Sequence, residues 1–487
     1  MEDRQQTQPR PWVRAALVAV LAAFSVLAPL VLSAQKPRVL ASSYGLGTAR
    51  FELFAAFAAI SAGIVAAVEL RARRDRPVRE RLSIVAPFLV TLQYATLIGE
   101  YSHKPFDYDC YEYAGRAILL GEDPYTVGLN YLYPPLVGQA MALAHRGLTW
   151  GIALAGQVPQ AETVWGTVFY LYQCAQLGLI LLLYFLAVRF ARRAGMEAAR
   201  APLVVALLLL FDNPLLRTLR HGQVNLWILD LALIAILFAG RMPWLAGWAL
   251  ALSIHMKLYP IMLLLPLAAG RRWRALAWTA LGCLAIALVQ TDLGRDWSPW
   301  LQFVHFYERA YPGEIAFRNS SFHSVAFNTL RFLFAAPSPS LGTPLRVVAS
   351  TMSVVMAIWL GLRIIERERD ARARGPEARS GVDEERRLLT NAADALAFSL
   401  LISQSVWEHH FLFALPLVIV AASTLWHERP AAIATSAFMM LGMPTFDLFP
   451  LSYHRLVGLV WLLLVTRPRA SPFGCRARFP GGVATER

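Results

Sequence analysis

The sequence predicts an all-α polytopic membrane protein, and three observations carry this prediction: its composition, its repeated apolar segments and the placement of its basic residues. Hydrophobic residues make up 57% of the 487 residues, and the mean hydropathy is +0.46. A soluble domain of this length would need a larger polar surface. One helical span of a bilayer takes roughly 20 apolar residues, and by that measure the chain holds about 12–14 transmembrane helices.

The predicted spans are apolar runs bounded by charged or turn-forming residues. They lie near residues 12–34, 51–70, 82–99, 163–188, 201–216, 224–240, 275–291, 344–364, 391–407, 411–426, 431–447 and 455–466. The first run is too long for a secretory signal and lacks a small-residue cleavage site, so it is kept as a span. Residues 243–270 are too many for one span and carry Lys257 and Pro260 in the middle, which predicts a hairpin of two short helices.

The basic residues give the chain a predicted orientation. The net charge is +14, and with a cytoplasmic N-terminus 31 of the 46 Lys and Arg fall on the inner side and 15 on the outer side. This asymmetry follows the positive-inside rule, so the positive charge is explained by the orientation of the chain in the membrane. No nucleic-acid partner is therefore predicted. Both termini are then cytoplasmic, and the long loops 100–162 and 292–343 lie outside.

These long loops differ in character from the inner loop at 365–390. The inner loop is densely charged around a Gly-Pro break, which predicts a solvated cytoplasmic linker. The outer segment 132–148 is apolar but too short to span, and it fits an amphipathic helix on the membrane surface.

The stretch FDYDCYEYAGRAILLGEDPY, residues 106–125, concentrates five carboxylates and four tyrosines in the first outer loop. If this stretch is helical, Asp107 and Tyr111 share one face, while Asp109 points nearly the opposite way. Gly121 can end that helix in a left-handed conformation. Taken by residue type alone, the acids could equally serve only to solvate a loop.

Seven short motifs along the chain together resemble glycosyltransferase family 87, in the C-type (GT-C) superfamily of polytopic enzymes that use polyprenyl-phosphate sugars. They are DYDCYEYA, GEDPY, YPPL, GQVN, AGWALALSIHMKLYP, RRWRA and WEHHF. The resemblance runs from about residue 82 to the end. It implies a GT-C-type transmembrane glycosyltransferase domain at 82–487, preceded by an addition at 1–81 made of two spans and a basic inner loop.

The resemblance implies a reaction as well as a fold. A sugar, mannose or another hexose or pentose, would pass with inversion from a polyprenyl-phosphate donor to a lipid or glycan acceptor on the outer face of the cytoplasmic membrane. Asp107 matches the family's catalytic base, with Asp109 as the fallback, in the catalytic loop 100–162. Neither a metal nor a cofactor is implied. The competing interpretation is a transporter or flippase of lipid-linked saccharides, which would not need an outward carboxylate loop.

The remaining candidate site residues are polar groups at the predicted outer ends of helices. An ammonium at a helix break in an apolar hairpin is costly unless it meets water or an anion, so Lys257 is the leading candidate for the donor phosphate. The substrate-binding candidates are Asp109, Tyr111, Gln223, Asn225, Lys257, Arg318, His409 and His410.

Several of these candidates have a structural alternative. Asn225 can cap a helix in place of binding a sugar hydroxyl, and Arg318 can be a solvated loop residue. His255 fits a hydrogen-bonded core histidine better than a ligand. Asp212 can cap a helix or line the cavity, and Asp230 can bond a neighbouring helix.

Overall fold

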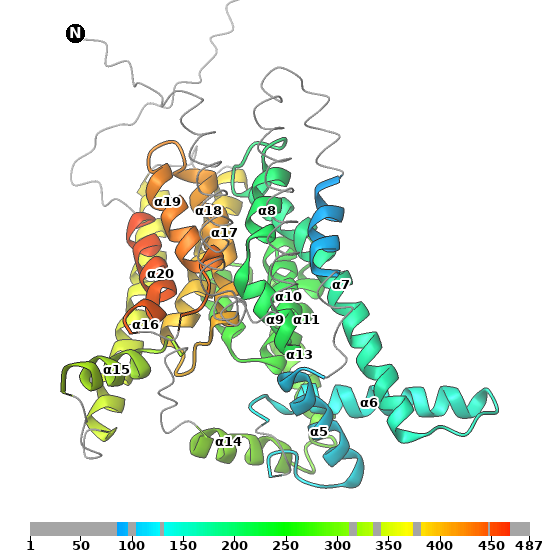
Figure 1. Cartoon of the computed structure of the whole chain (residues 1–487). Helices are drawn as coiled ribbons and strands as arrows, with labels where there is room; N and C mark the ends of the chain where they lie inside the picture. Colours follow the sequence, from blue (N-terminus) through cyan, green and yellow to red (C-terminus); the bar gives the residue numbers. More distant parts are fainter. Residues whose placement is uncertain are drawn as a thin grey trace, which may run out of the picture.

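The computed structural model describes residues 85–95, 104–126, 131–310, 319–334, 342–373, 381–446 and 449–467. Every regular element in these ranges is a helix, which confirms the all-α prediction (Figure 1). The predicted spans at 12–34 and 51–70, and with them the addition at 1–81, lie outside the described residues. After a helix at 85–95, the main helices are α5 (Phe106–Leu120), α6 (Pro135–Leu154), α7 (Ala161–Arg193), α8 (Ala201–Leu210), α9 (Asn213–His221), α10 (Asn225–Phe238), α11 (Pro243–Met256), η1 (Tyr259–Leu263), α12 (Leu264–Ala269), α13 (Trp273–Gln290), α14 (Ser298–Ala310), α15 (Phe322–Phe334), α16 (Gly342–Ala373), α17 (Gly381–Ile402), η4 (Glu408–Ala414), α18 (Leu415–Thr424), α19 (Pro430–Ala437), η5 (Phe438–Gly442), η6 (Leu451–Tyr453) and α20 (His454–Val465).

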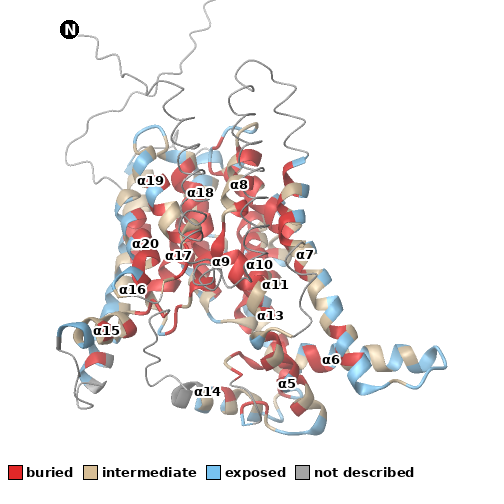
Figure 2. Cartoon of the chain, viewed as in Figure 1, coloured by how far each residue is buried: buried red, intermediate tan, exposed pale blue. Residues whose placement is uncertain are grey.

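The helices pack into one bundle with two connected parts. In one part α10 packs against α7 and α11, and α11 packs against α13. In the other part α17 packs against α16 and α18, and α20 packs against α19 and η5. Contacts of α17 with η1 and η4 join the two parts, so the buried residues form a continuous core (Figure 2).

Within the described ranges, three helices are long and apolar enough to cross a bilayer by themselves: Ala161–Arg193, Trp273–Gln290 and Val347–Ala373. The last of these buries only 17% of its most apolar window, and its exposed side chains include Val355, Ile358 and Leu362. An apolar helix face left open to this extent is suited to lipid and costly in water. The chain is therefore a polytopic membrane protein, as predicted.

The predicted span 201–216 is broken, the segment 243–270 is interrupted, and both breaks bring polar groups into the bundle. α8 and α9 meet at an angle of 55°, and the Asp212 carboxylate caps α9 by accepting a 2.8 Å hydrogen bond from the backbone N–H of Leu215. The capping alternative for Asp212 is thus confirmed. The segment 243–270 is interrupted as predicted, because α11 ends at Met256 and Lys257 takes an extended conformation.

The helices α5, α6 and α14 lie at one end of the bundle and cross its long axis (Figure 1). α6 confirms that the segment 132–148 is helical. It buries Val137 and Met141 but exposes Leu143 and Trp150. α14 and α15 add further helices in the second long loop, where the sequence analysis predicted no regular structure.

The charged segment 365–390 differs from the solvated linker that was predicted. α16 continues to Ala373 and α17 already begins at Gly381, so only 374–380 fall outside the described helices. The prediction failed because charged side chains were taken as a sign of loop. A polar helix end paired with an adjacent helix has the same composition.

Candidate functional site

Asp107 lies in the first turn of α5, directly after Phe106 and with Pro105 as the preceding cap residue. Its side chain is 18% exposed, and its Oδ2 lies 3.9 Å from Nδ1 of His221 at the end of α9. Burial raises the pKa of the Asp107 carboxyl to about 6, while a hydrogen bond from Gln223 and the charge of Lys257 lower it. The carboxylate is thus shielded yet still ionised near neutral pH, as a general base requires.

The other acids of the opening stretch face elsewhere, so the helical periodicity separated them correctly. Asp109 is only partly buried, and its pKa is raised by desolvation and by Glu112, against a lowering by Lys104. Glu112 is paired with Lys104 at 2.7 Å and with Arg116 at 2.8 Å, and it therefore supports the fold of the loop.

The turn Gly222–Asn225, between α9 and α10, lies against α5. Gly222 has φ +67°, and a Cβ there would be 2.8 Å from the Cβ of Tyr108, so both the conformation and the close approach require glycine. The Tyr111 hydroxyl accepts a 3.3 Å hydrogen bond from the backbone N–H of Val224. Tyr111 is fully buried and thus holds α5 against the turn.

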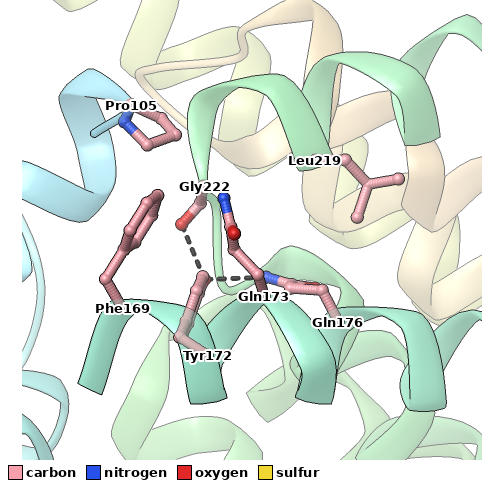
Figure 3. Close-up of a pocket in the computed structure, with 7 residues that line it drawn as sticks. All are labelled: Pro105, Phe169, Tyr172, Gln173, Gln176, Leu219 and Gly222. Carbon is pink, nitrogen blue, oxygen red and sulfur yellow. Dashed lines mark hydrogen bonds between the residues drawn. The ribbon is translucent and has the colours of Figure 1, made fainter. Parts of the chain in front are cut away.

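A small pocket lies behind this turn, on the side facing α7 (Figure 3). The Tyr172 hydroxyl donates to the carbonyl of Gly222 at 2.6 Å, and Gln176 Nε2 donates to the carbonyl of Gln223 at 3.2 Å. α7 therefore fixes the turn through the backbone carbonyls of Gly222 and Gln223. The pocket is lined by Pro105, Phe169, Tyr172, Gln173, Gln176, Leu219 and Gly222.

Lys257 enters the same site from the break after α11. Its Nζ donates to Oδ1 of Asn225 at 3.0 Å and lies 2.7 Å from Nε2 of His410. It also lies 5.3 Å from the ring centroids of both Tyr133 and Tyr259. Among the described residues, no carboxylate comes within ion-pair distance of Lys257, so its nearest partners are neutral or aromatic groups.

The helix η4 supplies the two histidines. The His410 Nδ1 accepts a 3.0 Å hydrogen bond from the backbone N–H of Trp407. The carbonyl of His409 lies 3.5 Å from Nδ2 of Asn225, and the His409 ring is 5.8 Å from that of His221. A buried ion pair of 3.0 Å between Arg217 and Glu408 joins α9 to η4 beneath these rings.

The structure brings most of the predicted site residues together. Those that converge at the α5 end of the bundle are Asp107, Tyr111, Gln223, Asn225, Lys257, His409 and His410. Asp109 stands apart on α5, and Arg318 lies outside the described residues. His255 bonds Gln290 at 3.0 Å, which confirms the core interpretation. Asp230 is buried in α10, and neither of its carboxyl oxygens has a hydrogen-bond partner among the described residues, so none of the described helices supplies the bond that was considered for it.

Sequence reasoning missed His221, Tyr133 and the Arg217–Glu408 pair. All of these except Arg217 lie within or next to a quoted motif: His221 precedes GQVN, Tyr133 opens YPPL, and Glu408 is the acid of WEHHF. Proximity to a motif was the available signal, but the partner of each residue lies far away in the sequence.

Fold and site together define a class of protein. It is an all-α membrane protein in which one polar site holds a shielded carboxylate and a cation. Such a site is suited to removing a proton from a hydroxyl group that lies beside an anionic group. The sequence profile of glycosyltransferase family 87 matches residues 131–378, and the chain belongs to that family. The matched segment begins after α5, so it does not include Asp107.

Curated relatives agree with the family. A polyprenol-phosphate-mannose-dependent alpha-(1-2)-phosphatidylinositol mannoside mannosyltransferase of Mycobacterium tuberculosis is 28% identical over 401 residues, covering 74% of this chain and 81% of its own. The protein of the same name from Mycolicibacterium smegmatis is 26% identical, covering 68% and 73%. A phosphatidylinositol pentamannoside mannosyltransferase of M. tuberculosis is 25% identical, covering 68% and 72%. No solved structure matches the chain.

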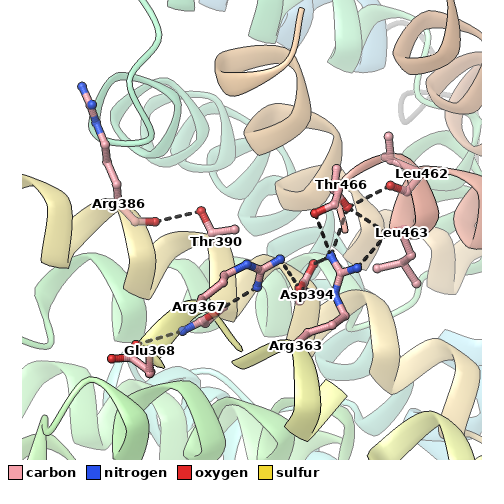
Figure 4. A network of polar contacts seen from close by, with 10 residues as sticks. Arg363, Arg367, Glu368, Arg386, Thr390, Asp394, Leu462, Leu463 and Thr466 are labelled. Atoms are coloured by element: carbon pink, nitrogen blue, oxygen red, sulfur yellow. Dashed lines mark hydrogen bonds and ion pairs between the residues drawn. The ribbon is translucent and has the colours of Figure 1, made fainter. Parts of the chain in front are cut away.

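A second charged cluster is formed where α16, α17 and α20 meet (Figure 4). The Arg363 guanidinium donates from Nε and Nη2 to Asp394 at 2.8 and 3.1 Å, and Arg367 Nη2 lies 2.6 Å from the same carboxylate. Arg363 also donates to the carbonyl of Leu463 at 2.7 Å. Asp394 and the Arg363 side chain are almost fully buried, so this cluster is a closed contact between helices.

Proposed function

We propose that this protein transfers mannose from a polyprenyl-phosphate donor to a hydroxyl group of a glycolipid acceptor, with inversion at the sugar carbon. The names of the curated relatives support the donor and the lipid acceptor. The observation that carries the proposal is the meeting of Asp107 and Lys257 across the Gly222–Asn225 turn. The uncharged turn Gly222–Asn225 separates the base Asp107 from the cation Lys257. The two opposite charges therefore stay apart, and each can meet its own substrate group.

In this mechanism Asp107 takes the proton of the acceptor hydroxyl as its oxygen forms a bond to the anomeric carbon. The bond from that carbon to the phosphate oxygen breaks, and its electron pair stays on the phosphate. The leaving phosphate gains negative charge, which Lys257 stabilises as a point charge, with His409 and His410 beside it. Asp109 and Arg318 stay predicted contacts of the substrates, and the reaction needs no metal or cofactor.

The charge asymmetry of the sequence supports a site on the outer face of the cytoplasmic membrane, with both termini inside. Val158, 91% exposed in the turn between α6 and α7, offers a test of this orientation. In a cysteine-free background, Val158→Cys should react with a membrane-impermeant thiol reagent on intact cells. Labelling only after the cells are opened would place the site inside and exclude the outward mechanism.

The deciding experiment uses the purified protein with polyprenyl-phosphate mannose and a lipid extract, and detects new glycolipid by mass spectrometry. We expect a product heavier than an acceptor by one hexose, formed with release of polyprenyl phosphate. Movement of the intact donor across proteoliposome membranes without any transfer would support the flippase alternative instead.

A further inference from the structure

The proposed reaction gives no role to the motif RRWRA, residues 271–275, which begins in the turn between α12 and α13. Its first residue, Arg271, has φ +54°, a left-handed conformation that is costly for a residue with a Cβ and that helix ends commonly give to glycine. The turn would therefore form more easily with glycine at this position. The reason for a guanidinium here lies in what its side chain can bind.

The helices α11 and α13 run parallel and pack closely together. A Cβ on Gly247 would overlap the Cβ of Trp278, and a Cβ on Gly282 would lie 2.8 Å from the Cβ of Ala251. The second contact lies further along the chain on both helices, so the two helices run in the same direction. They therefore begin side by side, at one end of the bundle.

The turns that precede these two helices are neighbours. A Cβ on Gly240, between α10 and α11, would lie 3.5 Å from Nη1 of Arg272, between α12 and α13. Arg272 also pairs with Glu384 at 2.9 Å, which ties its turn to α17. The 14 residues of α11, about 20 Å of helix, separate these turns from Lys257. The two turns thus lie at the end of the bundle opposite the candidate site.

Three exposed arginines in or next to these turns form a surface that we call the arginine patch: Arg241, Arg271 and Arg274. In the described part of the chain, none of their side chains has an ion pair or a hydrogen bond. Arg272, which lies among them, has its carboxylate partner on α17. The patch therefore carries three positive charges that the protein itself leaves uncompensated.

Two tryptophans place the arginine patch at the level of the lipid headgroups. Trp244 is 50% exposed and Trp273 is 62% exposed, and Trp273 is the first residue of a helix that can span a bilayer. Tryptophan is enriched where the hydrocarbon meets the headgroups, and guanidinium groups bind phosphate through several donors at once. We propose that the arginine patch binds the phosphate groups of anionic phospholipids in the leaflet opposite the candidate site. This interaction does not depend on the proposed reaction.

The test adds phosphatidylglycerol to the purified full-length protein in uncharged detergent and follows the unfolding temperature. A lipid that binds the folded state raises this temperature, so wild type should be stabilised by phosphatidylglycerol and much less by phosphatidylcholine of the same chain length. The triple variant Arg241→Gln, Arg271→Gln and Arg274→Gln removes the three charges. It should need about 100-fold more phosphatidylglycerol for the same stabilisation, at roughly fivefold per arginine.

The matched control removes the same charge at the end that carries the candidate site (Figure 1). The triple variant Arg146→Gln, Arg295→Gln and Arg331→Gln changes three exposed arginines there and should keep the wild-type response. Arg271→Gly provides a second variant if the patch variant fails to fold, because glycine suits φ +54°. It should weaken the response roughly fivefold.

Three results would overturn the proposal. The first is wild-type protein that phosphatidylglycerol stabilises no more than phosphatidylcholine does. The second is an unchanged response to phosphatidylglycerol in the patch variant, or in Arg271→Gly if that variant alone folds. The third is an equal stabilisation of wild type by inorganic phosphate at the same concentration, which would indicate a site for a free anion and not for a lipid.

Discussion

The charged groups around Asp394 and around Lys257 are both shielded from water, yet they are built in opposite ways. Around Asp394, each guanidinium is in direct contact with a carboxylate, and the remaining donors of Arg363 reach backbone carbonyls. Around Lys257, the contacts are an amide, an imidazole and two aromatic rings. Asp107 is near enough to sense the Lys257 charge but forms no ion pair with it.

The charges around Asp394 stabilise the packing of helices, whereas the charge of Lys257 is available to bind a ligand. A buried ion pair with every donor matched has no capacity left for a substrate, and removing one partner is costly. A shielded cation with only neutral partners gains from an added anion such as a phosphate. Mutations in the first cluster should therefore act on stability, and mutations in the second on turnover.

The largest effect is expected from Asp394→Asn. It leaves Arg363 and Arg367 without their shared carboxylate in the interior, which costs about 3–5 kcal/mol of stability. The thermal unfolding of detergent-solubilised protein measures this, with Asp370→Asn on the neighbouring helix α16 as the control. If Asp394→Asn unfolds like wild type, the closed cluster is not what holds α16 to α17.

Asp107→Asn should give the reverse pattern. The amide keeps the size and polarity of the side chain but cannot accept a proton, so turnover should fall roughly 100-fold or more while the unfolding temperature stays near that of wild type. Asp109→Asn is the matched control and should retain activity. If Asp109→Asn is instead the inactive variant, Asp109 is the base, and the catalytic face of α5 is the one that carries Asp109.

Lys257→Met removes the charge but keeps the length of the stem. The loss of phosphate stabilisation should cost about 2 kcal/mol in kcat/KM, or roughly 30-fold, in well-folded protein. The binding of polyprenyl phosphate, measured as a rise in unfolding temperature, should weaken in parallel. Lys104→Met, which breaks only the pair with Glu112, serves as the control. Unchanged donor kinetics in Lys257→Met would assign the lysine to the fold and leave the phosphate to His409, His410 or Arg318.

The pH profile gives the smallest but most diagnostic effect. The active form of Asp107 is the carboxylate, and its pKa is raised to about 6 by burial. Activity should therefore be level above about pH 7 and fall with decreasing pH, tenfold per unit below the pKa. Because Lys257 lowers this pKa, the residual activity of Lys257→Met should lose its acidic limb at a higher pH than wild type. An identical limb in both proteins would show that the two groups do not interact.

Much of the fold and part of the site could be predicted from the sequence. Apolar runs and breaks are local properties, so the long spans within α7, α13 and α16, the interruption at Lys257 and the helix after Pro134 were found by counting. The face of Asp107 on α5 followed from helical periodicity. The helical course of 365–373 and 381–390 and the helices α14 and α15 were missed, because their composition is as polar as that of a loop and contacts with neighbouring helices stabilise them.

The sequence by itself determined that this is a polytopic membrane protein, and its motifs resembled those of the family that the comparison then established. Tertiary structure alone decided how these motifs work together. Lys257 meets Asn225 across 32 residues and His410 across 153, and Tyr133 meets Gln223 across 90. Sequence periodicity does not predict such pairs, because they depend on the angles at which broken helices pack and on which hydrogen-bond donors are shielded from water. The same packing gave Asp394 its two arginines and, within the part of the chain that the structure describes, left Lys257 without a carboxylate partner. This contrast separates the structural cluster around Asp394 from the candidate site.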